Sequence, residues 1–178
     1  VEEFNRFAAE RGYKMDPGVT ENLFASFSVS KLLILGGLSE KEYNDFVVLI
    51  SEYFGCVPCL DYLPEYVDAT TKIFFDCDAE GYATQKNIFM ALAIAAAAPA
   101  KVALSAVDGL NAENAIKWFS PFMNYIRSPK KKNVLVMRDQ HDEKIVYAMG
   151  SNLWMLARLS DYDAVDSLPQ FLVDNRIK

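Results

Sequence analysis

Continuous apolar runs alternate with segments of helical period along this chain. The runs "KLLILGG" (31–37), "KVALSAVD" (101–108) and "NLWMLARLS" (152–160) have the length and composition of strands buried on both faces. Between them, apolar residues recur at intervals of three and four, which is typical of amphipathic helices. The alternation predicts a three-layer α/β/α sandwich with a mostly parallel sheet, built as a single domain over 1–178.

The same periodicities assign the remaining segments. Ser39-x-x-Glu42 has the form of a capping box and predicts the start of a helix that Gly55 ends. Further helices are expected over 1–12, from a cap at Thr20 to 29, over 82–98 and over 112–125. The pattern also predicts a strand over 72–78, a β-hairpin insertion over 133–149, a short helix after Pro169 and an irregular connection over 56–71.

The turn after the first apolar run begins like a phosphate-binding loop. In the motif G-x-x-x-x-G-K-[ST], backbone amides cradle the phosphates, the lysine neutralises them and the hydroxyl ligates magnesium. Here Gly36 and Gly37 supply the entry. Counted from Gly37, the second glycine falls on Glu42, the lysine on Tyr43 and the hydroxyl on Asn44. Taken alone, this segment favours an ordinary strand-to-helix turn.

The order of elements resembles a known family, and two segments carry the match most clearly. They are "SKLLILGGLS" (30–39) and "NLWMLARLSDYDAVDSLPQFLVDNR" (152–176). From Gly12 to Arg176 the chain resembles the nucleotide-binding core of AAA+ ATPases, closest to the branch that contains the GTPase subunit of McrBC-type restriction systems. The resemblance implies a P-loop NTPase-like fold whose helical lid, expected to start near Arg176, is absent or truncated.

Other motif positions of that family depart from its pattern in this chain. The family's second buried strand ends in Asp-Glu, where the aspartate assists magnesium and the glutamate activates water. Here Asp108 is kept, and Gly109 stands in place of the glutamate. The polar sensor position falls on Ser160. The arginine finger falls on Asn175, with Arg176 one residue late.

These departures predict a catalytically silent, non-enzymatic module that acts in assembly or protein interaction. Phosphoryl transfer depends on positioning and electrostatic stabilisation, and the groups that provide them are missing. At the helix start, Glu40 and Glu42 satisfy the positive end of the dipole and repel a triphosphate. We therefore expect no bound cofactor and a vestigial nucleotide site, which consists of Gly36, Gly37, Ser39, Tyr43, Asn44 and Asp108.

Two alternatives to this hypothesis stay open. The chain could be a nucleotide-binding NTPase subunit, with ATP or GTP and Mg²⁺ as ligands, whose site a neighbouring AAA+ subunit completes. It could instead be a small α/β protein with a metal or redox site at the C-x-x-C motif over 56–59. The remaining soft ligands, Cys77 and His141, lie far along the chain, which favours two incidental thiols. Asp76, Asp78 and Glu80 lack the spacing of a calcium loop.

Composition and charge limit the classes of partner that the chain can bind. Hydrophobic residues make up 52% of the 178 residues, so the chain can bury a core, and its net charge of -6 disfavours sequence-independent DNA binding. The one basic cluster, "RSPKKK", supports nucleic acid or an acidic face of another subunit as a partner; its cations are Arg127, Lys130, Lys131 and Lys132. No secretory signal is visible, so we expect a cytoplasmic protein.

Overall fold

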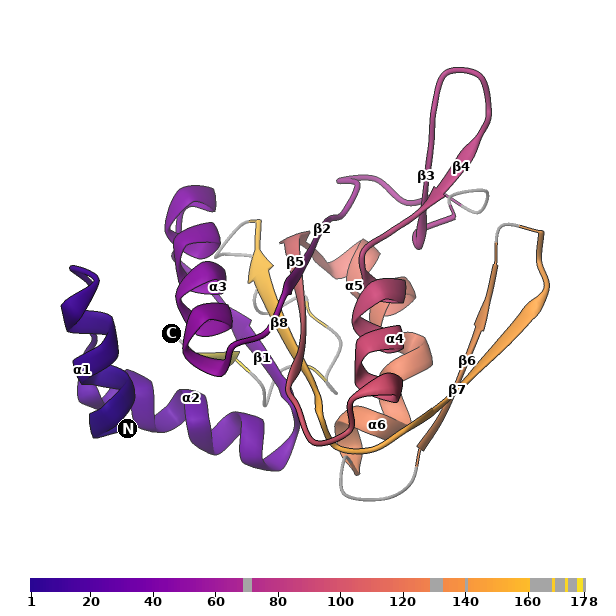
Figure 1. Cartoon of the computed structure of the whole chain (residues 1–178). Helices are drawn as coiled ribbons and strands as arrows, with labels where there is room; N and C mark the ends of the chain where they lie inside the picture. Colours follow the sequence, from indigo (N-terminus) through magenta and orange to yellow (C-terminus); the bar gives the residue numbers. More distant parts are fainter. Residues whose placement is uncertain are drawn as a thin grey trace.

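The central element of the fold is a sheet of five strands that all run parallel. The computed structural model describes residues 1–68, 72–128, 133–139, 141–160, 168, 172 and 176–177. Across the sheet the strands follow the order β2-β5-β8-β1-β9 (Figure 1). Their bounds are β1 Leu32–Leu35, β2 Pro58–Tyr62, β5 Ala103–Leu110, β8 Leu153–Leu159 and β9 Arg176–Ile177.

Both faces of this sheet carry a hydrophobic core. In β1, Leu32 and Ile34 belong to one cluster of buried residues, whereas Leu33 and Leu35 belong to the other. This follows from the pleat, because successive side chains of a strand point to opposite faces. In a strand that is buried on both faces, polar residues do not alternate with apolar ones, because neither face meets water. This explains the continuous apolar runs in the sequence.

Helices cover both faces of the sheet, so the fold is α/β (Figure 1). On one face lie α1 Glu2–Glu10, α2 Pro17–Val29 and α3 Glu40–Phe54. On the other lie α4 Ile88–Ala97, α5 Ala112–Phe119, the 3₁₀-helix η1 Ser120–Phe122 and α6 Met123–Arg127. The predicted arrangement of helices around a parallel sheet is confirmed. None of the helices in the described part of the chain is both long and apolar enough to cross a bilayer.

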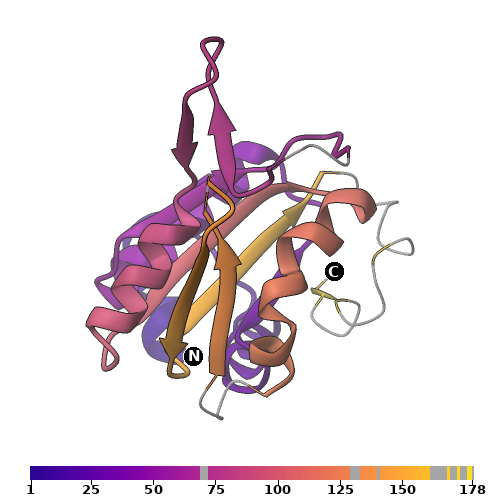
Figure 2. The same ribbon diagram turned by 90° about the vertical axis from the view of Figure 1, so that its right-hand side faces the viewer.

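Two β-hairpins accompany the sheet. The expected one, β6 Asn133–Arg138 with β7 Lys144–Met149, lies between α4 and α6 on the same face of the sheet (Figure 2). Its inward residues join the core, while Val134, Val136 and Val146 point outward and are exposed. The other hairpin, β3 Phe75–Cys77 with β4 Ala83–Gln85, rises beyond the end of β2 (Figure 1).

Three local predictions are wrong. The segment predicted as irregular contains β2, where Pro58 occupies the first position of an edge strand and so removes no needed hydrogen bond. The predicted helix over 82–98 begins only at Ile88, because 83–85 form β4. The strand expected over 72–78 is only β3, which pairs with β4 outside the main sheet.

The start of α2 also differs from the prediction. Asp16, not Thr20, caps the helix, and its carboxylate accepts a hydrogen bond of 2.8 Å from the Gly18 amide. Pro17 follows at the first helical position, where its missing N–H has no cost. Thr20 lies inside the helix and donates its hydroxyl to Asn5 Oδ1 at 2.7 Å.

The outer edge of β2 is covered by side chains from the segment that enters α4. Asn87 Nδ2 donates to the Leu60 carbonyl at 2.7 Å, and Lys86 Nζ donates to the Tyr62 carbonyl at 3.1 Å. Asp61, buried on the same strand, accepts from the backbone amides of Asn87 and Ile88 at 2.7 and 2.8 Å. These bonds attach the beginning of α4 to the edge of the sheet.

Candidate functional site

The turn between β1 and α3 is short, and its own side chains accept hydrogen bonds from its backbone amides. β1 ends at Leu35 and α3 begins at Glu40, so residues 40–42, which a phosphate-binding motif would place in its loop, form the first helical turn. Gly37 takes a φ of 77°, a conformation that favours glycine. The chain therefore turns directly from strand into helix.

The predicted capping box is confirmed at this turn. Ser39 Oγ accepts from the Glu42 amide at 3.3 Å, and the Glu42 carboxylate accepts from the Ser39 amide at 2.8 Å and from its hydroxyl at 2.7 Å. The side-chain and backbone hydrogen bonds from Ser39 lower the pKa of Glu42. The positive end of the helix thus already holds a negative charge.

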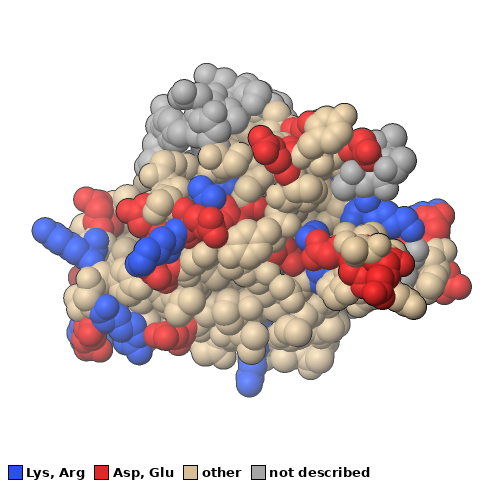
Figure 3. Space-filling model, turned by 90° about the horizontal axis from the view of Figure 1, so that it is seen from above, with Lys and Arg blue, Asp and Glu red and all other residues tan. Residues whose placement is uncertain are grey.

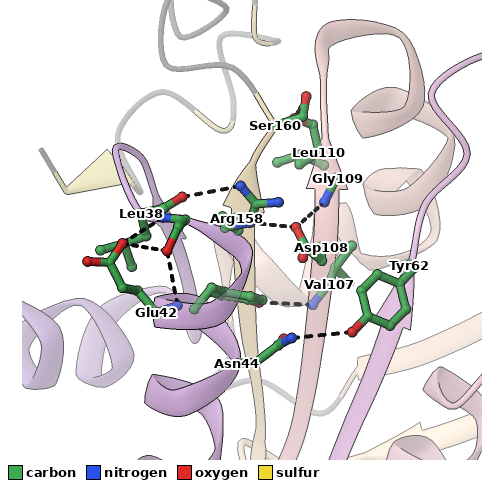
Figure 4. Close-up of polar contacts among 12 residues, drawn as sticks. Leu38, Glu42, Asn44, Tyr62, Val107, Asp108, Gly109, Leu110, Arg158 and Ser160 are labelled. Atoms are coloured by element: carbon green, nitrogen blue, oxygen red, sulfur yellow. Dashed lines mark hydrogen bonds and ion pairs between the residues drawn. The ribbon is translucent and has the colours of Figure 1, made fainter.

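Beside this turn, Arg158 joins two strands and the loop (Figure 4). Its Nε donates to Asp108 Oδ1 at 2.6 Å, and its Nη1 donates to the Leu38 carbonyl at 3.2 Å. The Arg158 and Asp108 side chains are 14% and 2% exposed, so both charged groups are largely buried. One guanidinium therefore neutralises the carboxylate at the end of β5 and holds the loop that follows β1.

A break in strand pairing positions Asp108. The register between β5 and β8 shifts between Val107 and Leu110, which leaves Asp108 and Gly109 in a bulge. Gly109 has a φ of 80°, and a Cβ at this position would lie 3.2 Å from the Leu63 carbonyl. The backbone conformation and the close Leu63 carbonyl therefore both favour glycine at this position.

Tyr43 lies inside the core rather than at the surface. Its side chain is fully buried, and its hydroxyl accepts a hydrogen bond of 3.1 Å from the Val107 amide on β5. Burial raises the pKa of Tyr43 well above its usual range, so the phenol stays neutral. At the position expected for a phosphate-binding lysine, the chain has a neutral group that links α3 to the sheet.

Two buried oxygens in this region have no hydrogen-bond partner among the described residues. They are Asn44 Oδ1 and Asp108 Oδ2. The Asn44 amide donates through Nδ2 to the Tyr62 hydroxyl at 3.4 Å, at the end of β2 (Figure 4). Within the described residues, no group of three or more His, Cys, Asp or Glu side chains is arranged to hold a metal ion.

The site residues expected from the sequence thus lie at one end of the sheet. Gly36, Gly37 and Ser39 form the turn, Tyr43 and Asn44 follow on α3, and Asp108 lies near the end of β5. Ser160 lies just after β8, where its hydroxyl donates to the Leu110 carbonyl at 3.2 Å. Asn175 and the side chain of Arg176 lie outside the described residues.

Arg158 was missed from the sequence, although a signal was present. It is the only charged residue in "NLWMLARL", the run that forms β8. A cation in a buried strand needs a partner, because an isolated charge in the core is costly. The identity of that partner could not be read from the sequence, since it depends on the register between β5 and β8.

The C-x-x-C motif lies at the entrance to β2. Cys56 is half-buried and Cys59 is buried. Burial raises the pKa of both thiols, that of Cys59 to about 11. A thiol that stays protonated at neutral pH is a poor nucleophile and a poor metal ligand, so this environment does not favour redox chemistry.

Two other candidate ligands, Asp78 and His141, lie in exposed turns. Asp78 Oδ1 accepts from the Glu80 and Tyr82 amides at 3.0 and 2.8 Å and so shapes the turn between β3 and β4. His141 is exposed at the tip of the β6–β7 hairpin.

The basic cluster is only partly described. Arg127 is the last residue of α6, while Lys130, Lys131 and Lys132 lie outside the described residues.

Comparison with known proteins gives no further assignment: no family model matches the chain, and no curated protein matches its sequence.

Proposed function

We propose that this chain is a catalytically silent AAA+-like module that acts by its shape, in assembly or protein interaction. The observation that carries the proposal is the Arg158 guanidinium between Asp108 and the Leu38 carbonyl. In the family that the sequence resembles, that aspartate assists magnesium. Here an internal cation compensates its charge, which removes much of the electrostatic attraction for a metal ion.

The β1–α3 turn supports the same proposal. A phosphate bound at a helix N-terminus uses backbone amides and the positive end of the dipole. In this chain Ser39 bonds the Glu42 amide, and the Glu42 carboxylate lies at the same end of the helix. A triphosphate would have to displace this carboxylate or bind beside it, and electrostatic repulsion opposes both.

The distribution of charge at this end of the molecule agrees with that reading. Figure 3 views the end at which the parallel strands finish, and the described Lys and Arg side chains there are interspersed with Asp and Glu. A polyphosphate site draws on a local excess of cations. The described part of this surface shows no such excess of cations.

The β6–β7 hairpin supports the interaction part of the proposal. Val134, Val136 and Val146 are exposed on its outer face, and Val136 pairs directly with Val146 across the two strands. A row of exposed valines on a sheet is a surface that another protein can cover. The proposal therefore places a protein contact at this hairpin.

Isothermal titration with ATP and GTP in the presence of Mg²⁺ tests the silent site. We expect no heat of binding from the purified chain at high micromolar concentration, and no nucleotide turnover. Saturable binding that is lost in Asp108→Asn would contradict the proposal. A buffer titration and a titration of the Arg158→Lys variant, which retains the cation, serve as controls.

Sedimentation velocity tests the hairpin contact in its simplest form, self-assembly. If the chain associates, Val136→Asp should weaken the association, because it places a charge in the exposed valine row. Val48→Asp is the matched control, since Val48 on α3 is similarly exposed, 48% against 45% for Val136, on the opposite side of the sheet. A chain that stays monomeric at all concentrations would exclude self-assembly as the form of the contact.

One observation favours the alternative of a nucleotide-binding subunit completed by a partner. Asp108 Oδ2 and Asn44 Oδ1 are buried and unsatisfied within the described residues, and such oxygens attract a donor or a cation. Mixing the chain with an active AAA+ subunit and ATP, GTP or neither distinguishes the two candidates. Assembly that needs both nucleotide and Asp108 would favour this alternative over the silent module.

A further inference from the structure

A cavity of about 630 Å³ lies between the end of β2 and strand β3. This volume is within the range of small-molecule binding sites, roughly 300–1,000 Å³. The cavity is outside the Arg158–Asp108 network, and it is open on one side. The carboxyl ends of parallel strands are the usual place for a ligand in an open α/β sheet.

The walls of the cavity are mostly apolar. Leu63, Ile73 and Phe75 line it, and each of these side chains is buried against the rest of the core. The cavity surface therefore offers contacts to an apolar group of modest size. Burying such a group there removes its surface from water, which is the main favourable term in binding of this kind.

Three ionisable side chains also line the cavity, Lys72, Asp76 and Lys86, and of the two lysines Lys72 is exposed whereas Lys86 is buried. The Lys86 side chain is 5% exposed, and its Nζ donates to Asp76 Oδ1 at 2.5 Å and to the Tyr62 carbonyl at 3.1 Å. An ammonium group has three N–H donors. The described residues accept two of them, so one donor of a nearly buried cation is left for a ligand.

The partner of Lys86 is held far less firmly than Lys86 itself. The Asp76 side chain is 68% exposed, so water can solvate its carboxylate when the ion pair opens. Asp61, the other carboxylate near Lys86, is buried, and its two oxygens accept from the Asn87 and Ile88 amides at the start of α4. Asp76 is therefore the replaceable counter-ion of this cation.

We propose that this cavity binds a small carboxylate that carries an apolar group. The ligand carboxylate takes the place of Asp76 on Lys86, and its apolar part packs against Leu63, Ile73 and Phe75. Asp76 stands in for the ligand when the cavity is empty, but it contributes no apolar contact. The ligand is either a free carboxylic acid or the C-terminal residue of a partner chain, because both present the same chemistry.

An NMR titration of the ¹⁵N-labelled chain with 3-phenylpropionate tests the proposal. We expect saturable shifts at Leu63, Ile73 and Phe75, and no comparable binding of the neutral control 3-phenylpropanol. Equal binding of the acid and the alcohol, or shifts confined to other residues, would overturn the proposal. So would the absence of saturable shifts at millimolar probe.

Two variants sharpen the result. Lys86→Met keeps the length and apolarity of the stem, and it should weaken binding of 3-phenylpropionate by at least about tenfold. Asp76→Asn removes the internal competitor and should tighten binding several-fold, which tests the exchange independently of Lys86→Met. Unchanged or weaker binding in Asp76→Asn contradicts the proposed exchange of carboxylates.

The source of the ligand is resolved by a pair of peptides. One ends in phenylalanine with a free carboxylate, and the other is its C-terminal amide. Tighter binding of the free peptide than of 3-phenylpropionate assigns the cavity to a partner's C-terminus, whereas equal or weaker binding assigns it to a small acid. Binding of the amide as tight as that of the free peptide overturns the proposal for both sources.

Discussion

The two ion pairs at the ends of the strands differ in how much of each pair is buried. In Arg158–Asp108 both side chains are largely removed from solvent, and the arginine also bonds the Leu38 carbonyl. In Lys86–Asp76 only the lysine is buried, and the carboxylate is mostly exposed. The same pairing of charges thus produces a fixed connection in one place and an exchangeable one in the other.

This difference shows why a buried charge alone does not define a functional site. Removing one member of a fully buried pair leaves its partner as an unsolvated charge. Removing the buried member of a half-exposed pair leaves an exposed partner that water can stabilise. On our proposals, the first arrangement closes a site against ligands, and the second keeps a site able to accept one. The following predictions test this contrast.

The largest effect is expected for Arg158→Met. The substitution leaves Asp108 buried without a counter-charge and should destabilise the fold by about 3–5 kcal/mol. Urea unfolding followed by circular dichroism measures the loss. Lys86→Met is the matched control, and it should cost about 1 kcal/mol or less because Asp76 remains solvated. Equal losses in the two variants would remove the distinction between the pairs.

A smaller loss is expected for Tyr43→Phe. The phenylalanine fills the same space but leaves the buried Val107 amide without its acceptor, at a cost of about 1–3 kcal/mol. Tyr62→Phe makes the same chemical change on a half-exposed side chain with one long hydrogen bond, so it should have little effect. Thermal unfolding of both variants decides whether the Tyr43 hydroxyl connects α3 to β5.

Ser39→Ala should cost about 1 kcal/mol, the usual effect of removing a helix N-cap. The loss arises because the Glu42 amide and carboxylate both lose a bond to the Ser39 hydroxyl. Ser28→Ala, which removes an exposed hydroxyl bonded within its own helix, should be nearly neutral. If Ser39→Ala instead opened the helix end to phosphate, titration with inorganic phosphate would reveal it.

The smallest effect concerns the pH dependence of the same cap. The pKa of Glu42 is lower in the folded chain than its ordinary value of 4.5, so the folded state favours its ionised form. Its contribution to stability is fully present above pH 4.5 and is lost as the pH falls through the lowered folded pKa. Comparing the wild-type chain with Glu42→Gln at pH 7 and at pH 3 should show a difference that shrinks in acid. A difference that grows in acid would contradict this assignment.

The buried strands of the fold were predictable, and the edge strand was not. β1, β5 and β8 are covered on both faces, so their sequences are mostly apolar on both sides of the strand. β2 has one free edge and carries Pro58 and Asp61, residues that usually mark a loop. A strand forms there because β2 pairs with β5 on its inner edge, while Asn87 and Lys86 satisfy carbonyls on its outer edge.

The residues of the candidate site were predictable from the sequence, but the contacts between them were not. The sequence placed Asp108 at the end of a strand and Tyr43 on the first turns of a helix. That Arg158 meets Asp108 depends on a bulge between β5 and β8, and that Tyr43 reaches Val107 depends on how α3 packs on the sheet. Both are tertiary relations between distant segments, which local periodicity does not encode.

The covered edge of β2 has a consequence for the behaviour of the chain at high concentration. An edge strand with free carbonyls and amides is a template on which a strand from another molecule can add. Here Pro58 has no N–H to offer, and the Leu60 and Tyr62 carbonyls already accept from side chains. The edge is therefore protected against intermolecular β-pairing, because the side chains of Lys86 and Asn87 occupy carbonyls that a strand of another molecule would need.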